Sequence, residues 1–255
     1  MIDPKIFAEL QNYGIITNVG LEASDFKNLD ELKNYGLATS MGTDAVYDKV
    51  LNKINVVEGV STEDELKKLV ATGGKTKLTA DITLTDYIEV RSDVTIDLNG
   101  HKITHPLNSK SKYPDVFEVY SSGKLTILGD GEVNAENGYA VYAAGDSIVI
   151  LDGGTYLSPV SAVDARKNAN VTINGGTFKV DGSKNAEGDF GQKFTLNLRD
   201  KTGNYVSDKS IITVKGGKFY KFNPAESESE PEITNFVAEG YKSVKNGDWF
   251  VVKKA

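Results

Sequence analysis

The chain repeats one short motif five times: VTIDLNG (94–100), LTILGDG (125–131), IVILDGG (148–154), VTINGG (171–176) and ITVKGG (212–217). The motifs start 31, 23, 23 and 41 residues apart. A unit that recurs every 20 to 50 residues, roughly, is typical of stacked repeat architectures, in which each unit contacts its neighbours. The motif therefore predicts a solenoid in which equivalent residues of successive repeats form columns.

Within each motif the side chains are expected to alternate between two faces, as in a half-buried strand. Superposition of the motifs places two aliphatic columns on the inward face and a mostly threonine column on the outward face. The inward columns are Val94, Leu125, Ile148, Val171, Ile212, and Ile96, Ile127, Ile150, Ile173, Val214; the outward column is Thr95, Thr126, Val149, Thr172, Thr213.

Two further strands per repeat keep a similar offset. One contributes Phe117, Ala140 and Val163, then Val119, Tyr142 and Ala165; the other follows the glycines and contributes Ile103, Val133, Tyr156, Phe178 and Phe219. Three strands per turn of about 23 residues favour a parallel β-helix over a sandwich, whose antiparallel hairpins would not give this self-similarity. The Gly-Gly pairs are expected at tight corners, where glycine adopts positive φ at little cost. A single winding chain is favoured, and three such solenoids side by side remain open.

Both ends of the repeat region carry signals for caps. Ser61 and Thr62 precede EDELKKLVATGG, which predicts a capping helix with Leu66, Leu69, Val70 and Ala71 on its apolar stripe. At the other end, Asn246-Gly247 predicts a hairpin turn. We therefore expect a helical cap (59–75), rungs (76–223), an acidic solvated linker (224–232) and a C-terminal hairpin (233–255), in which Trp249 and Phe250 pack against the last rung.

Residues 1–58 differ in character from the rest. The stretches 26–36 and 44–54 carry helical signals, and both are too short to be stable alone. The segment is expected to be a helical anchor or oligomerisation segment, and a small helical subdomain packed on the stack is the alternative. The two long spacings place insertions at 105–115, and at 181–193 with 200–210, where either partner binding or neutral surface variation fits.

Composition restricts the class of function. The chain is 39% hydrophobic with a formal net charge of -7, which is typical of a folded soluble protein and does not favour nucleic acid or anionic membrane as a partner. The absence of cysteine excludes disulfides and thiolate metal sites. Neither a secretory signal at the N-terminus nor a membrane span is expected.

Catalytic chemistry has few candidates. Asp152, Asp164 and Glu118 are the carboxylates considered, with Arg166 as a possible cation. Glu118, Val141 and Asp164 are expected in one outward column, which is no continuous acidic ladder. His101 and His105 are expected on the surface, and the loop Asp181–Asp189 departs from a calcium loop at Ala186 and Gln192. We therefore assign no catalytic, cofactor or metal residues.

The run LTADITLTDYIEVRSDVTIDLNGHKIT (78–104), the "GGT(Y/F)" rungs and the ending FVAEGYKSVKNGDWFVV (236–252) resemble the pectate-lyase-like right-handed β-helix proteins. The resemblance covers residues 61–255 and implies a single-stranded right-handed parallel β-helix. With the helical N-terminal segment, the layout is similar to phage head-fibre and capsid-decoration proteins. It implies a non-enzymatic, homotrimeric virion protein assembled in the host cytoplasm. Residues 1–58 would bind the major capsid protein or another virion protein, and the shaft would contact the host surface, including its glycans. A tail spike that binds or cleaves glycan and a bacterial surface adhesin lacking its leader are the alternatives.

Overall fold

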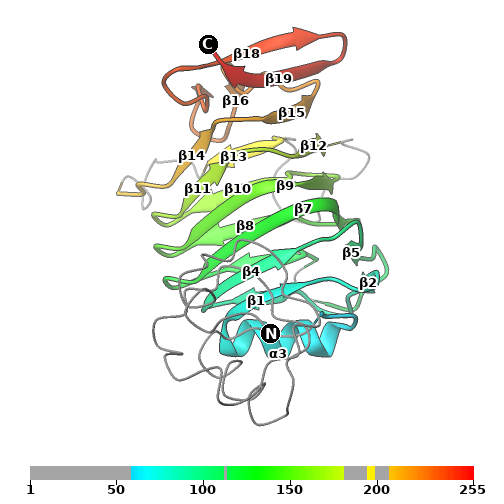
Figure 1. Ribbon diagram of the computed structural model, residues 1–255. Helices are drawn as coiled ribbons and strands as arrows, with labels where there is room; N and C mark the ends of the chain where they lie inside the picture. The colour runs from blue at the N-terminus through cyan, green and yellow to red at the C-terminus, as the bar shows by residue number, and fades with distance from the viewer. Residues whose placement is uncertain (1–58, 112–113, 181–193, 199–206) are drawn as a thin grey trace, which may run out of the picture.

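The computed structural model describes residues 59–111, 114–180, 194–198 and 207–255 (Figure 1). In these ranges the chain forms one helix, α3 (Glu63–Thr72), and nineteen strands, most of them paired in parallel. The fold is therefore mainly β. The helices predicted at 26–36 and 44–54, and the loop at 181–193, lie outside the described residues.

The parallel strands form three ladders, here named A, B and C, and the chain enters them in that order in each repeat. Ladder A contains β1 (Gly74–Lys77), β4 (Asp93–Asp97), the first halves of β7 (Lys124–Ala135) and β9 (Ile148–Ser158), β11 (Asn170–Ile173) and β14 (Ile211–Val214). Ladder B contains β2 (Ile82–Thr83), β5 (Lys102–His105), the second halves of β7 and β9, β12 (Thr177–Val180) and β15 (Gly217–Tyr220). Ladder C contains β3 (Ile88–Val90), β6 (Phe117–Val119), β8 (Val141–Ala144), β10 (Val163–Arg166) and β13 (Leu196–Leu198). Since β7 and β9 run through both A and B, those two ladders belong to one twelve-stranded sheet, which also includes β18 (Tyr241–Asn246) and β19 (Trp249–Lys254) and lies beside the five-stranded ladder C.

The column predicted for ladder B is confirmed. Val133 pairs with Ile103 and Tyr156, Tyr156 with Phe178, and Phe178 with Phe219, and all five residues are buried. The aromatic rings of Tyr156 and Phe178 stack at 4.9 Å, as do those of Phe178 and Phe219. Parallel in-register pairing places identical positions about 4.8 Å apart, which is the spacing of stacked rings.

The predicted columns are wrong by one residue at one strand in each of two ladders, at β9 of the third repeat in ladder A and at β8 of the second repeat in ladder C. Leu125 pairs with Val149, not with Ile148, and Ile127 pairs with Leu151. Ile148 faces outward and is 43% exposed, and Ile150 is half-buried. In ladder C, Val141 and Ala143 likewise take the inward positions expected for Ala140 and Tyr142.

A β-bulge in β7 explains this shift. Gly129 pairs with Gly153 at an offset of 24 residues, whereas Glu132 pairs with Thr155 at an offset of 23, so β7 holds one extra residue at Asp130-Gly131. Because IVIL is aliphatic throughout, its alternation specifies no face, and the bulge sets the register.

The glycine corners between ladders A and B have the expected backbone. Gly176 has φ 102°, and a Cβ there would lie 2.7 Å from the carbonyl oxygen of Gly153. Gly217 has φ 107° at the next level. Glycine is thus required both for its dihedrals and for the close approach of successive backbones.

The stack is covered by α3 at its N-terminal end. Thr62 and Glu65 form a capping box, and Leu66, Leu69 and Val70 are buried against the first strands. Ala71, which was expected on the apolar stripe, is exposed. The helix covers the otherwise open end of the hydrophobic core (Figure 1).

At the C-terminal end, β19 (Trp249–Lys254) pairs antiparallel with β15 and with β18 (Tyr241–Asn246). The two turn residues are Gly247 and Asp248, one position later than the Asn246-Gly247 centre that was expected. Trp249 pairs with Tyr220 and Phe250 with Phe219, as predicted for packing against the last rung. Before this hairpin, β16 (Ser227–Glu228), in the segment expected to be a linker, pairs antiparallel with β17 (Ile233–Thr234), at the start of the segment expected to be the C-terminal hairpin.

Candidate functional site

Ladder C carries a row of polar side chains on its outward face. The register places Glu89, Glu118, Tyr142, Asp164 and Asn197 on adjacent strands of this row. The alternate residues, including Phe117, Val141 and Val163, are buried in the core. Because side chains alternate between the two faces of a strand, the residues between these buried positions form a polar row on the outward face of ladder C.

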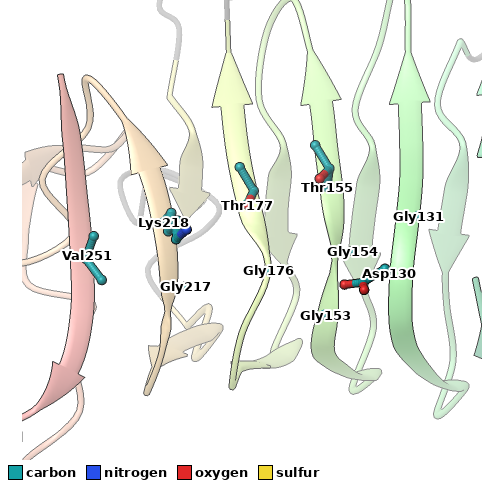
Figure 2. A pocket seen from close by; sticks show the side chains of 10 residues that line it. All are labelled: Asp130, Gly131, Gly153, Gly154, Thr155, Gly176, Thr177, Gly217, Lys218 and Val251. Atoms are coloured by element: carbon teal, nitrogen blue, oxygen red, sulfur yellow. The ribbon is translucent and has the colours of Figure 1, made fainter. Parts of the chain in front are cut away.

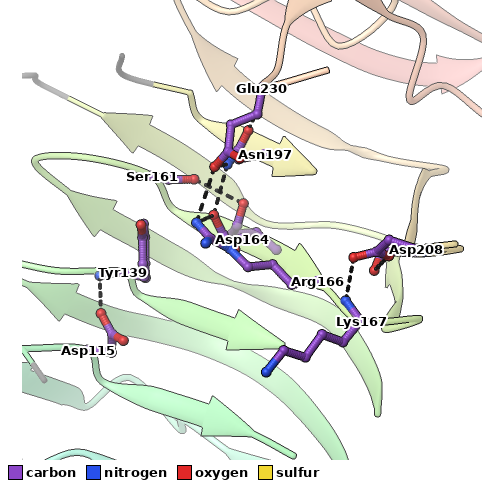
Figure 3. A network of polar contacts seen from close by, with 11 residues as sticks. Asp115, Tyr139, Ser161, Asp164, Arg166, Lys167, Asn197, Asp208 and Glu230 are labelled. Atoms are coloured by element: carbon purple, nitrogen blue, oxygen red, sulfur yellow. Dashed lines mark hydrogen bonds and ion pairs between the residues drawn. The ribbon is translucent and has the colours of Figure 1, made fainter. Parts of the chain in front are cut away.

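Three of the five residues in this row are covered rather than solvated. Glu118, Asp164 and Asn197 are each at most 3% exposed, although their strand positions face away from the core. Asp115, Tyr139 and Glu230 lie over the row (Figure 3). The sequence-based expectation of an exposed acidic column containing Val141 is wrong, since Tyr142 occupies that position and the carboxylates are buried.

Asp164 lies at the centre of the best-connected part of the row. Arg166 donates two hydrogen bonds to it, from Nε to Oδ1 (2.5 Å) and from Nη2 to Oδ2 (2.9 Å), and Asn197 Nδ2 donates to Oδ2 at 2.9 Å. Burial alone lowers the pKa of Arg166, but the hydrogen bonds and charge of Asp164 outweigh it, so this pKa is raised. A charge-paired, bidentate geometry of this kind is costly to break, because it would leave a buried charge without a partner.

Glu230 joins this cluster from a distant part of the chain. Its Oε1 accepts hydrogen bonds from Arg166 Nη2 (3.2 Å) and Asn197 Nδ2 (2.9 Å), and its backbone N–H donates to Asn197 Oδ1 at 2.9 Å. Glu230 belongs to the acidic run expected to be a solvated linker. That expectation is wrong for Glu230, which fastens the β16–β17 hairpin to ladder C.

A second carboxyl pair lies further along the row. Burial, followed by the charge of Glu118, raises the pKa of Asp115 well above its ordinary value, and a hydrogen bond from the Tyr139 N–H (2.7 Å) opposes this. Burial also raises the pKa of Glu118, which hydrogen-bonds with Asp115 and Tyr120. Two neighbouring buried carboxyl groups cannot both ionise easily, so the pair holds a proton to higher pH than an isolated carboxyl group does.

Three tyrosines separate these two clusters. Tyr142 packs edge-on against Tyr120 at 5.7 Å and stacks on Tyr139 at 6.0 Å. The guanidinium groups of Arg91 and Arg166 lie over the rings of Tyr120 and Tyr142 at 5.2 and 5.7 Å. Burial raises the pKa of Tyr120 and Tyr139, so both phenols stay protonated and act as packing and hydrogen-bonding groups.

Of the carboxylates considered from the sequence, Asp164 pairs with Arg166, whereas Glu118 lies two strands away in the same row. Asp152 lies on ladder A, paired with Leu128 and exposed, apart from this row. Sequence reasoning missed Asp115, Tyr139, Asn197 and Glu230. No local pattern marks them, because they come from segments that meet only in the folded chain.

The expectation that both histidines lie on the surface is met by His101 and is wrong for His105. His105 is fully buried, with Nδ1 2.5 Å from the Asp115 carbonyl oxygen and Nε2 2.9 Å from Ser109 Oγ. His101 lies 3.3 Å from Asp81 near the surface. Within the described ranges, no group of three or more His, Asp or Glu residues is placed to hold a metal ion.

A second feature is a glycine-floored trough across ladder B, with a volume of about 410 Å³. Gly131, Gly153, Gly154, Gly176 and Gly217 line it, and Thr155, Thr177 and Lys218 follow one another on successive strands (Figure 2). The close backbone approaches at these glycines account for the trough without a ligand.

Comparison of the chain with models of protein families, with curated proteins and with solved structures gives no match. In the described part of the chain, no helix is long and apolar enough to cross a membrane.

Proposed function

We propose that this chain is a bacteriophage virion protein, a capsid (head) fibre or decoration protein, whose described part is a right-handed, single-stranded parallel β-helix. Three copies would project side by side toward the host surface, and residues 1–58 would attach them to the major capsid protein or another virion protein. The right hand is supported by the general preference of crossovers between parallel strands.

The observation that carries this proposal is the set of three continuous ladders with a cover at each end. Ladder A has six strand levels, which at about 4.8 Å per level span about 24 Å. The core is a column of stacked rings and aliphatic side chains, and α3 and the β18–β19 hairpin close its ends. Such a body suits a rigid spacer that holds one end at a fixed distance from the other.

The burial and the internal hydrogen bonds of the polar row favour a structural role over a catalytic one. Both carboxylate oxygens of Asp164 accept hydrogen bonds within the protein, and the residue is 0% exposed. A general base needs a free lone pair within reach of its substrate. The row is therefore better suited to fastening the covering segments than to turnover.

The experiment is labelled electron microscopy of purified particles, combined with deletion of residues 1–58. We expect label on the head, and we expect the deleted chain to stay folded while losing incorporation. Label confined to the tail, or undiminished incorporation of the deleted chain, would refute the proposal. An upstream signal sequence in the full reading frame would instead favour a bacterial surface adhesin.

A tail spike that cleaves host glycan is the second candidate, and one observation favours it. Glu118 and Asp164 lie two strands apart in ladder C, about 9.6 Å between backbones, with Tyr142 between them. A carboxyl group of raised pKa and an ion-paired carboxylate at such a separation resemble the acid and base of an inverting glycosidase. Release of reducing ends from host polysaccharide, abolished by Glu118→Gln, would replace the first proposal with this one.

A further inference from the structure

The outward face of ladder B becomes basic at its C-terminal end. Lys179 on β12, Lys218 on β15, Lys221 just after β15, Lys242 on β18 and Lys253 on β19 are all exposed. In the antiparallel pairing of these strands, Lys218 lies opposite Val251 and Lys242 opposite Lys253, which places Lys218, Lys242 and Lys253 on one side of the sheet. We call these five residues the basic face. None of them takes part in an ion pair between described residues.

An aromatic pair lies within the basic face. Tyr220 and Trp249 are half-buried neighbours with ring centroids 5.1 Å apart. The ammonium groups of Lys179 and Lys221 lie 5.4 and 5.1 Å from the centre of the Tyr220 ring. Hydrogen bonding to Tyr220 raises the pKa of Lys221, so the lysine remains charged near neutral pH. Tyr220 and Trp249 therefore form an aromatic patch surrounded by positive charge, on a chain whose net charge is -7.

The opposite pattern occurs on residues 224–234, which we call the acidic strap. Glu226, Glu228 and Glu232 are exposed, and the strap contains no lysine or arginine. Ile233 pairs with Glu228 across the β16–β17 hairpin and is 66% exposed, the highest value among the large hydrophobic residues described. Glu230 anchors the strap to Arg166 and Asn197, so its exposed side chains are held in place.

We propose that the acidic strap of one copy docks on the basic face of a second copy, with Ile233 against Tyr220 and Trp249 and the exposed glutamates against the lysines. The two surfaces are complementary in both charge and polarity, because Ile233 is surrounded by glutamates and the Tyr220–Trp249 pair is surrounded by lysines. The inference rests on the self-association in the proposed function, and it assigns the surfaces that carry it.

The positions of the two surfaces determine the type of assembly. Both lie at the C-terminal end of the stack, near β15, β18 and β19 (Figure 1). Because the strap and the basic face are different patches, each contact is heterologous, and each copy offers one of each. Patches at the same level of a rod bring copies side by side, so the contacts can close into a ring rather than extend along the rod. A ring of three is the simplest closed form beyond a pair.

The test is sedimentation of the full chain with charge reversals on either surface. We expect wild-type protein to associate at about 100 µM in low salt and to dissociate in about 1 M salt, where the Debye length falls to about 3 Å. Lys218→Glu/Lys253→Glu and Glu228→Lys/Glu232→Lys should each weaken self-association at least tenfold. An equimolar mixture of the two variants should associate again, in even-numbered complexes, because alternating copies cannot close an odd ring.

Two controls separate docking from misfolding. Lys68→Glu/Lys75→Glu makes the same charge change on exposed residues at the other end of the stack and should leave association unchanged. Trp249 is the single tryptophan, so its emission should depend on protein concentration in wild-type protein and not in Ile233→Ala. A wild-type monomer at 100 µM, or association that survives both reversals, overturns the inference. Neither result bears on particle incorporation, which tests the proposed function separately.

Discussion

Replacement of Leu151 and Ile150, one at a time, by alanine tests the register of the third repeat. Leu151 is fully buried, and in ladder A it pairs with Ile127 and Ile173. Ile150 faces outward and is only half-buried. Both substitutions remove three carbon atoms, so the change in side-chain size is matched and only the environment differs.

The expected magnitudes follow from burial. Removal of three buried carbons costs about 2.4 kcal/mol in transfer free energy, and the cavity left in a stacked core raises this to about 3 to 4 kcal/mol. For Leu151→Ala this corresponds to a decrease in melting temperature of roughly 6 to 16 °C. For Ile150→Ala we expect about 1 kcal/mol, because much of the lost surface was already in contact with water.

Thermal and urea unfolding followed by far-ultraviolet circular dichroism measures both variants under one condition. If Ile150→Ala is the more destabilised of the two, the shifted register is refuted, because that result would favour the unshifted register with Ile148 and Ile150 inward. Val149→Ala serves as a second inward probe, and we expect it to behave like Leu151→Ala on a smaller scale.

Three further outcomes are expected. Gly176→Ala should lower the free energy of unfolding by about 2 kcal/mol or more, measured by urea titration, because φ is 102° and the new Cβ would lie 2.7 Å from the Gly153 carbonyl oxygen; an unchanged midpoint would show that the corner can relax. Arg166→Met should lower the free energy of unfolding by about 3 to 5 kcal/mol, because it leaves Asp164 buried without its cation. Arg166→Met/Asp164→Leu should recover most of that loss in the same urea titration. Equal losses in both variants would contradict a stabilising ion pair. The folded-state pKa of Asp115 is raised, so its contribution to stability is present at low pH and is lost as pH rises above the ordinary carboxyl range. Asp115→Asn should flatten this decline when urea midpoints are measured across pH. An unchanged slope would contradict the raised pKa.

The strand content and the ladder B column could be predicted because their signals are local and repeated. Phe178 and Phe219 follow glycine pairs at the same distance, so their alignment needs no knowledge of the fold. The capping helix was equally clear, since Thr62 and Glu65 form a capping box within four residues of chain. Periodicity failed only where the sequence was aliphatic throughout, at IVIL (148–151), and where a bulge changed the spacing.

The candidate site could be predicted only in part. Glu118 and Asp164 share a row because their offset follows the repeat. Burial of that row depends on segments 64 residues apart in sequence, since Glu230 reaches Arg166. An acidic run such as 224–232 has no local property that distinguishes an anchored glutamate from a solvated one.

By itself, the sequence determined that this chain stacks β-strands in register and closes the stack with a helix and a hairpin. These features depend on side-chain alternation, glycine spacing and capping residues, which act over a few positions. The tertiary structure alone decided which isoleucines face the core, which carboxylates are buried, and that acidic and basic surfaces lie at one end. Those features depend on hydrogen bonds and ion pairs between distant segments. Such contacts stabilise the fold only after folding has buried both partners next to each other.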